Sequence, residues 1–308
     1  MKLETFTILS KKDGLRLVGS YCVPEIKVKG VVQLVHGMAE HKERYEGFMK
    51  ALASFGYASV IHDLRGHGAS VRDDQDIGYF YEESGTFMVE DTHEISLLIK
   101  EKMGDVPFIL FGHSMGSLIV RAYCKKYDND IDALIVCGSP SKNKAAPLAC
   151  TLVNTMKKIK GERYRSAFIQ NLAFGPYKKK FPKETSENCW LSCNANVVKE
   201  YDNDRACGYT FTLNGFLNLF HLMMNVYEPS SWVINKPNLP ILFIAGSEDP
   251  CIGSRKAFQE SIDLMKKIGY AKVDARLIEG KRHEILNEDN KDEVYEILKN
   301  WIEKATKK

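Results

Sequence analysis

The sequence predicts an α/β fold, in which a mostly parallel sheet of eight strands carries helices on both faces and an inserted helical cap. Short apolar runs alternate with segments whose apolar residues recur at helical spacing, which favours parallel strands linked by helices. The alternation stops over residues 141–235, where helical patterns continue without a clear strand. We therefore expect a core of residues 1–140 and 236–308 and a helical cap of residues 141–235.

The core elements follow from apolar runs and turn signals taken in chain order. A hairpin is indicated where Lys12-Asp13-Gly14 separates two strand-like runs. Strands are expected at 5–9, 15–23, 31–35, 58–61, 106–111, 133–137, 241–245 and 273–278. Helices are expected at 41–55, 86–103, 117–123, 254–268 and 291–304, and in the cap at 148–159 and 216–226, with a loop containing Lys178-Lys179-Lys180.

Composition narrows the class of protein. The chain has 308 residues, of which 44% are hydrophobic and 27% charged, as in ordinary globular proteins. The net charge of +3 is too small to indicate nucleic-acid binding. No run is apolar enough for a signal peptide or a membrane span, so we expect a cytoplasmic protein. The eight cysteines contain no C-x-x-C pair, so we expect reduced thiols and no metal centre.

The segment Gly112-His113-Ser114-Met115-Gly116 fits the pattern G-x-S-x-G and lies between an expected strand and an expected helix. In that context the serine occupies a sharp, strained turn that exposes its hydroxyl above the sheet. The strand and the helix pass too close at such a turn to leave room for Cβ atoms, which explains the glycines. Ser114 is therefore the predicted nucleophile.

A serine nucleophile needs a base, and only His221 and His283 follow Ser114 in the sequence. His221 lies inside an expected helix, whereas His283 lies in a loop after a strand and is the predicted base. Asp249, just past the strand 241–245, is the predicted acid that orients the imidazole; the alternative is that it caps the helix near Ser254. Serine, acid and histidine then occur in the chain order of α/β-hydrolases.

Two backbone N–H groups must stabilise the oxyanion that forms during acyl transfer. Met115 follows the nucleophile and supplies one of them. Met38 is the candidate for the other, because His36-Gly37-Met38 follows an early buried strand. We expect His36 to brace this loop; the alternative is that His36-Gly37 is only a tight turn. These residues together predict a serine hydrolase that works through an acyl-serine intermediate, without a metal or organic cofactor.

With these residues in place, the chain resembles α/β-hydrolases of the monoacylglycerol lipase and lysophospholipase group, also called serine aminopeptidase-like. The resemblance rests on H-G-M-A-E-H-K-E-R-Y (36–45), H-D-L-R-G-H-G-A-S (62–70), F-G-H-S-M-G-S (111–117) and L-P-I-L-F-I-A-G-S-E-D-P (239–250). It implies Met38 as an oxyanion donor, a cap that shapes the acyl pocket, and a small-molecule lipid ester as substrate. Within the cap we expect substrate contacts from Phe211, Leu213 and Phe216.

The cap carries 13 Lys and Arg residues against 7 Asp and Glu residues, a net charge of +6. This charge suggests peripheral contact with anionic membranes, with a solvated loop around Lys178 as the alternative. Three other functions stay open: an aminopeptidase or amidase, with Glu200, Asp202 and Asp204 as the clustered acidic candidates, a short-chain esterase, and a non-catalytic binding module. Cys251, two residues beyond Asp249, is expected close to the site. The oligomeric state cannot be predicted.

Overall fold

A computed structural model describes residues 1–307 and shows the predicted α/β architecture. Within these residues, eight strands form one sheet in the order β1-β2-β4-β3-β5-β6-β7-β8. The β1–β2 and β2–β4 pairs are antiparallel, and every other pair is parallel. The strands are β1 Lys2–Leu9, β2 Arg16–Val23, β3 Gly30–Val35, β4 Tyr57–His62, β5 Phe108–His113, β6 Ala133–Cys137, β7 Ile241–Gly246 and β8 Val273–Ile278.

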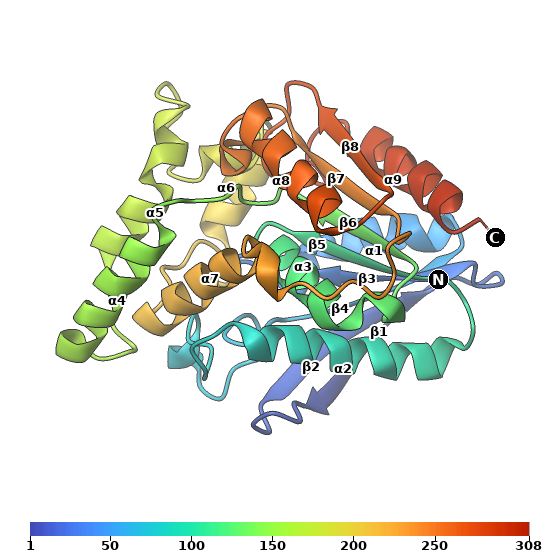
Figure 1. The fold of residues 1–308 in the computed structure, drawn as a ribbon, viewed down its shortest axis with the longest axis horizontal. Coiled ribbons are helices and arrows are strands. Elements are labelled where there is room, and N and C mark those ends of the chain that lie inside the picture. Colours follow the sequence, from blue (N-terminus) through green and yellow to red (C-terminus); the bar gives the residue numbers. More distant parts are fainter. Residues whose placement is uncertain (308) are drawn as a thin grey trace.

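Helices cover both faces of the sheet, and a group of further helices lies at one end of it (Figure 1). Helices α1 and α9 pack on one face, whereas α2, α3 and α8 pack on the other. The helices of the core are α1 Glu46–Ser54, α2 Thr86–Met103, α3 Met115–Tyr127, α8 Arg255–Ile268 and α9 Lys291–Ala305. Those of residues 141–235 are α4 Ala146–Lys160, α5 Ala167–Lys179, α6 Ala195–Asn203 and α7 Leu213–Val226.

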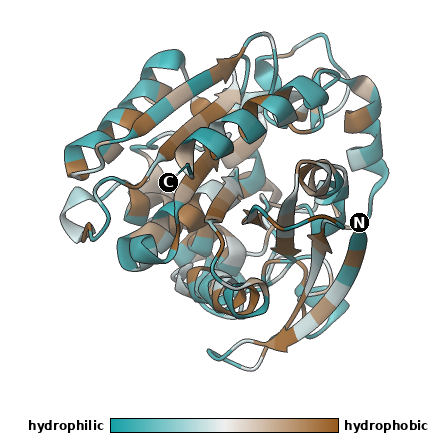
Figure 2. Ribbon diagram, turned by 90° about the vertical axis from the view of Figure 1, so that its right-hand side faces the viewer, coloured by the Kyte–Doolittle hydropathy of each residue, from teal (hydrophilic) through white to brown (hydrophobic). Residues whose placement is uncertain are grey.

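The central strands are buried on both faces, which explains their unbroken apolar runs. In β5, Phe108 and Leu110 point into the layer that contains α3, while Ile109 and Phe111 point into the opposite layer. There Phe111 packs against Phe48 of α1, with ring centroids 5.8 Å apart. Figure 2 shows this arrangement as hydrophobic strands between helices whose outer surfaces are largely hydrophilic. The fold class predicted from the sequence is confirmed.

Residues 141–235, called the cap segment below, leave the sheet after β6 and return to it before β7. Their helices lie on the side of the molecule opposite to both termini (Figure 1). Helix α7 packs on α4 and on α3, so its buried face joins the cap segment to the core. None of the helices within residues 1–307 is long and apolar enough to cross a bilayer.

Two predicted elements need correction. The expected helix over 41–55 begins as a 3₁₀ turn, Lys42–Tyr45, and becomes α-helical only at Glu46. The expected loop around Lys178 is wrong, because Lys178 and Lys179 form the last turn of α5. Pro176 lies inside that helix. A proline in a helix interior costs about 3 kcal/mol, so packing must offset this cost in α5.

Candidate active site

Ser114 lies at the junction of β5 and α3, where the chain turns sharply. Its backbone adopts φ 54° and ψ −119°, a conformation that a residue with a side chain rarely takes. The backbone N–H of Ser114 donates to the carbonyl oxygen of Cys137 at 2.9 Å, which ties the turn to the end of β6. The side chain is half-buried and faces a cavity between the sheet and the cap segment. The strained turn therefore presents the hydroxyl to the cavity.

The glycines on either side of this turn are required by close approach. A Cβ atom on Gly112 would lie 2.4 Å from the carbonyl oxygen of Gly116. A Cβ atom on Gly116 would lie 2.1 Å from the carbonyl oxygen of Val35 in β3. Both distances are far below van der Waals contact, so the backbone itself would have to move. The glycines let α3 start directly above the ends of β3 and β5.

His283 and Asp249 meet at the same edge of the sheet. His283 follows β8 and Asp249 follows β7, and both side chains are buried. The Nδ1 atom of His283 lies 2.9 Å from Oδ2 of Asp249. Oδ1 of Asp249 accepts a hydrogen bond from the backbone N–H of Cys251 at 2.8 Å. Asp249 thus caps the short turn Pro250–Ile252 and contacts the imidazole, whereas Ser254 caps α8.

The imidazole of His283 has a fixed position beside Ser114. Trp190 of the cap segment packs against this imidazole, with ring centroids 4.9 Å apart. The ring of His113 also packs against it, tilted, with centroids 4.6 Å apart. His283, Ser114 and Trp190 all line the same cavity. Within residues 1–307, Ser114 and His283 share no hydrogen bond. In the free form of such enzymes this bond is often long, and it shortens when substrate binds.

The loop after β3 is held by His36 and Glu40. Nε2 of His36 accepts from the backbone N–H of Leu64 at 2.9 Å, so Nδ1 carries the proton and donates to the Gly37 carbonyl oxygen at 2.8 Å. Burial lowers the pKa of His36 and keeps its imidazole neutral. Oε1 of Glu40 accepts from the Gly37 N–H at 2.6 Å. The intervening Met38 lines the cavity together with Met115, the first residue of α3.

An ionic network below this loop escaped the sequence analysis. Arg44 makes a bidentate pair with Glu284, at 2.7 and 2.6 Å, and a third contact with Oε2 of Glu40 at 2.8 Å. Burial opposes ionisation of His113, but the Glu40 carboxylate outweighs it and raises the pKa of His113. Nε2 of His113 lies 3.2 Å from the carbonyl oxygen of His283. The network therefore joins the Met38 loop to the His283 loop, across a sequence separation that no local pattern reveals.

The cavity has a volume of about 490 Å³ and lies between the carboxyl edge of the sheet and helices α4, α5 and α7. One part of its wall is apolar and belongs to the cap segment: Leu148, Leu152, Phe174, Leu219, Phe220 and Met223. Another part is polar: Glu187, Asn188, Tyr201, Tyr209 and Thr210. The wall that contains Ser114 thus has both apolar and polar parts, which suits an amphiphilic molecule.

The three expected substrate contacts are not part of this wall. Phe211, Leu213 and Phe216 are completely buried and line no part of the cavity. Phe211 packs edge-on against Phe80 at 4.9 Å and against His67 at 5.4 Å. These side chains form the interface between the cap segment and the core. The prediction was wrong because periodicity finds the buried face of a helix but not whether protein or a cavity lies against it.

Cys251 lies where the sequence predicted, on the cavity wall. The Tyr177 hydroxyl donates to its sulfur at 3.7 Å. Burial raises the pKa of the thiol, and the Asp249 carboxylate adds to this effect. A neutral thiol is a weak nucleophile, so Cys251 lacks the properties of a competing catalytic group.

Comparisons with known proteins agree with this geometry. Monoacylglycerol lipase of Mycolicibacterium smegmatis is 25% identical over 94% of this chain and 93% of its own length. Human monoglyceride lipase is 23% identical over 97% of this chain and 90% of its own length. The crystal structure of a thermostable carboxyl esterase from Bacillus coagulans superposes with a TM-score of 0.90, at 23% identity and 99% coverage of both chains.

The family match covers most of the core and the whole cap segment. Residues 26–290 match the family described as serine aminopeptidase, S33. The strained serine turn, the His283–Asp249 pair and strands β3 to β8 lie within that range. The chain therefore belongs to the S33 serine aminopeptidase family of α/β-hydrolases.

Proposed function

We propose that this carboxylic ester hydrolase cleaves monoacylglycerols or similar lipid esters, including lysophospholipids, through an acyl-serine intermediate. The proposal rests on one observation: Ser114 and His283 line the same cavity. The Nδ1 atom of His283 lies 2.9 Å from Oδ2 of Asp249, which orients the imidazole. Each group follows a strand of the parallel part of the sheet, whose rigid backbone fixes its position.

In the proposed reaction, the Ser114 hydroxyl attacks the ester carbonyl carbon while Nε2 of His283 takes its proton. Asp249 accepts the hydrogen bond from Nδ1 and stabilises the imidazolium. The backbone N–H groups of Met38 and Met115 bind the oxyanion of the tetrahedral intermediate. His283 then protonates the leaving alcohol. Water attacks the acyl-Ser114 ester with His283 again as the base, and His283 then returns the proton to the Ser114 oxygen as the carboxylic acid leaves.

The two regions of the cavity support an amphiphilic substrate. An acyl chain in the apolar region would contact Leu148, Leu152 and Phe174, and removal of a methylene group from water contributes about 0.8 kcal/mol. A glycerol-like head group would face Asn188 and Thr210 in the polar region. A longer acyl chain should therefore bind more tightly until the apolar region is full.

The acidic residues expected for an aminopeptidase lie elsewhere. Glu200, Asp202 and Asp204 line no part of the cavity. Asp202 accepts hydrogen bonds from Ser186 and Asn188, and Asp204 pairs with His41. Glu187 lines the cavity, and the two other carboxylates on its wall, Glu40 and Glu284, are both paired with Arg44. These contacts favour esters over peptides.

Hydrolysis of a substrate panel tests the proposal. The panel contains p-nitrophenyl esters of two to sixteen carbons, 1- and 2-monoacylglycerols, lysophospholipids and aminoacyl anilides. We expect kcat/KM to rise from acetyl to medium-chain esters, with good turnover of monoacylglycerols. Activity confined to acetyl and butyryl esters would contradict the lipid substrate, and anilide cleavage would instead favour a peptidase.

We also propose that the cap segment contacts anionic lipid surfaces from which the substrate enters. Leu148, Ile159, Phe168 and Leu172 on α4 and α5 are each more than half exposed. Leu148 and Leu172 also line the cavity, so the apolar surface continues into it. The exposed Lys158 and Lys179 lie on the same helices. Apolar side chains surrounded by cations are the features that interfacial segments use.

Vesicle co-sedimentation tests this contact. We expect binding to vesicles with anionic lipid and weaker binding to neutral vesicles. Lys158→Glu with Lys179→Glu should reduce the binding, and Phe168→Ser should reduce it further. Ile26→Ser removes an equally exposed apolar side chain from the loop between β2 and β3 and serves as the control. Equal binding to neutral and anionic vesicles would contradict an electrostatic contact.

A further inference from the structure

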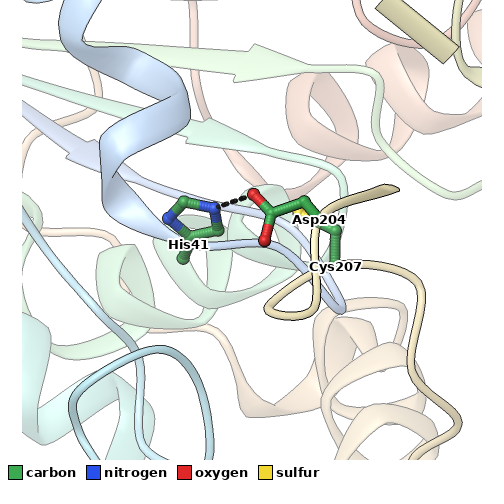
Figure 3. Close-up of side chains that lie close together, drawn as sticks. All are labelled: His41, Asp204 and Cys207. Atoms are coloured by element: carbon green, nitrogen blue, oxygen red, sulfur yellow. Dashed lines mark hydrogen bonds and ion pairs between the residues drawn. The ribbon is translucent and has the colours of Figure 1, made fainter. Parts of the chain in front are cut away.

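A second group of potential ligand atoms lies outside the active site, between the core and the cap segment. His41 follows the loop after β3, and Asp204 and Cys207 belong to the turn after α6. Nε2 or Nδ1 of His41, a carboxylate oxygen of Asp204 and Sγ of Cys207 lie within 4.8 Å of one another. Figure 3 shows the three side chains converging, with the imidazole pointing at the Asp204 carboxylate. Nitrogen, oxygen and sulfur ligands are thus available at one point.

The imidazole of His41 is oriented by a fourth residue. Nδ1 lies 2.6 Å from Oε2 of Glu43, and Nε2 lies 2.8 Å from Oδ2 of Asp204. A carboxylate on one ring nitrogen fixes the imidazole and raises its basicity, which is the arrangement found behind metal-bound histidines. Glu43 therefore occupies the position of an outer-shell partner, and Nε2 is the atom directed at the cluster.

The turn that carries the other two ligands is held independently of His41. The Ala206 N–H donates to Oδ1 of Asp204 at 2.8 Å, which leaves Oδ2 for the cluster. The Cys207 N–H donates to the Asp204 carbonyl oxygen at 3.0 Å, and the Gly208 N–H donates to that of Ala39 at 3.0 Å. These bonds place the carboxylate and the thiol on one side of the turn, facing the segment that contains His41.

We propose that His41, Asp204 and Cys207 form a zinc-binding site, with Glu43 as the group that orients His41. The three protein ligands are a histidine nitrogen, a carboxylate and a thiolate, all common in zinc sites, and water would complete the tetrahedron. Ligand bonds of about 2.0–2.3 Å separate tetrahedral ligands by about 3.3–3.8 Å. The ion would therefore widen the 2.8 Å contact between His41 and Asp204 by about 0.5–1 Å.

The charge of the cluster suits a cation. Glu43 and Asp204 place two carboxylates beside one imidazole, with Lys42 paired to the other oxygen of Glu43 at 2.6 Å. Cys207 would add a further negative charge when its thiol proton is lost to the ion. When the ion binds, it takes the place of two protons. One lies between His41 and Asp204, and the other is the thiol proton of Cys207. The side chains of His41 and Asp204 are partly exposed, at 13% and 38%, so an ion has access from solvent.

The site would be structural and separate from catalysis. Ala39, Tyr201 and Gly208 line the cavity, whereas none of the three ligands does. The Tyr201 hydroxyl donates to the Ala39 carbonyl oxygen at 2.8 Å, beside the Gly208 contact. An ion bound to His41, Asp204 and Cys207 would strengthen this link between the cap segment and the loop that contains Met38.

Cobalt substitution tests the site without relying on activity. Protein stripped with a chelator is titrated with Co²⁺, and the absorption spectrum is recorded. We expect one equivalent of Co²⁺ to give sulfur-to-cobalt charge transfer and the visible bands of a tetrahedral ion, and Zn²⁺ to abolish both. The charge-transfer band should be absent in Cys207→Ser and present in Cys193→Ser, a control that removes an exposed thiol.

A second group, Asp249, Cys251 and His283, could also hold an ion, and the experiment separates the two sites. The proposal requires the band to persist in Cys251→Ser. A band lost in Cys251→Ser and kept in Cys207→Ser would assign the ion to the active site and overturn the proposal, as would no band in the wild-type protein.

Affinity measurements test the ligand geometry. Glu43→Gln should weaken Zn²⁺ binding about 10–100-fold, because it removes the group that orients His41. Glu46→Gln removes a neighbouring carboxylate that pairs with Lys50, and it should leave the affinity unchanged. Equal affinity of Glu43→Gln and wild-type protein would contradict the proposed geometry.

Discussion

Two histidines that are buried without charge should make this protein sensitive to mild acid. His62 ends β4 and His67 lies in the loop that follows it, and neither side chain is exposed to solvent. Burial lowers the pKa of each from 6.5 to about 3, with a smaller contribution from His36. Neither nitrogen of His62 has a hydrogen-bond partner within the described chain, so nothing there stabilises a proton on it.

The sign and the size follow from proton binding. Each histidine has a folded pKa below its unfolded value, so the unfolded chain binds more protons and stability falls as the pH drops from about 6.5 towards 3. Between pH 6.5 and 4.5, each histidine lowers the free energy of unfolding by about 2 kcal/mol. The pair together contributes about 4–5 kcal/mol, a large part of the 5–15 kcal/mol that stabilises a typical domain.

Urea denaturation of wild-type protein and His62→Phe at both pH values measures this effect. Phenylalanine has a similar shape and does not titrate, so the variant should lose about 2 kcal/mol less than wild type between pH 6.5 and 4.5. Other titrating groups are common to both proteins and cancel in the difference. Tyr57→Phe, in the same strand, is the control and should lose as much as wild type. Equal losses in His62→Phe and wild type would refute the neutral, buried state of His62.

Three further predictions concern the active site. Gly116→Ala should prevent correct folding of the serine turn, because its Cβ would lie 2.1 Å from the Val35 carbonyl oxygen; circular dichroism melting should show a lower Tm than for Ala122→Gly, a control in the same helix. Asp249→Asn should lower kcat by about 10⁴-fold, since an amide selects the wrong imidazole tautomer, and a loss below tenfold in steady-state assays would contradict its role. Cys251→Ala should leave the sensitivity of activity to thiol reagents unchanged, because burial raises the pKa of the Cys251 thiol and keeps it neutral; clear protection in inactivation kinetics would contradict this.

The core could be predicted from the sequence because its signals are local. A strand that is buried on both faces must be apolar throughout, as Phe108–Phe111 is, and the serine turn needs its glycines wherever it occurs. The contact between Asp249 and His283 could be anticipated because Asp249 follows the buried strand β7 and His283 follows the neighbouring parallel strand β8. The exposed side chain of Glu248 and the buried one of Asp249 agree with the choice between these adjacent acids.

The cap segment was less predictable because its features depend on tertiary contacts. The helical periodicity placed Phe216 on a buried face, but it could not show that this face packs against the core. In the structure, Leu148 and Phe174 line the cavity instead. The Arg44–Glu284 pair joins residues that are 240 positions apart, so no local pattern reveals it. The same is true of the His41–Asp204 contact, which underlies the proposed zinc site.

Active-site labelling tests the central proposal, a nucleophilic Ser114, most directly. The protein is treated with a fluorophosphonate probe, digested, and analysed by peptide mass spectrometry. We expect the label on Ser114 alone, none in Ser114→Ala, and slower labelling in His283→Ala, which lacks the base. Ser117→Ala changes the neighbouring serine of α3 and should be labelled like wild type. Labelling of another serine, or undiminished labelling of Ser114→Ala, would contradict the proposed mechanism.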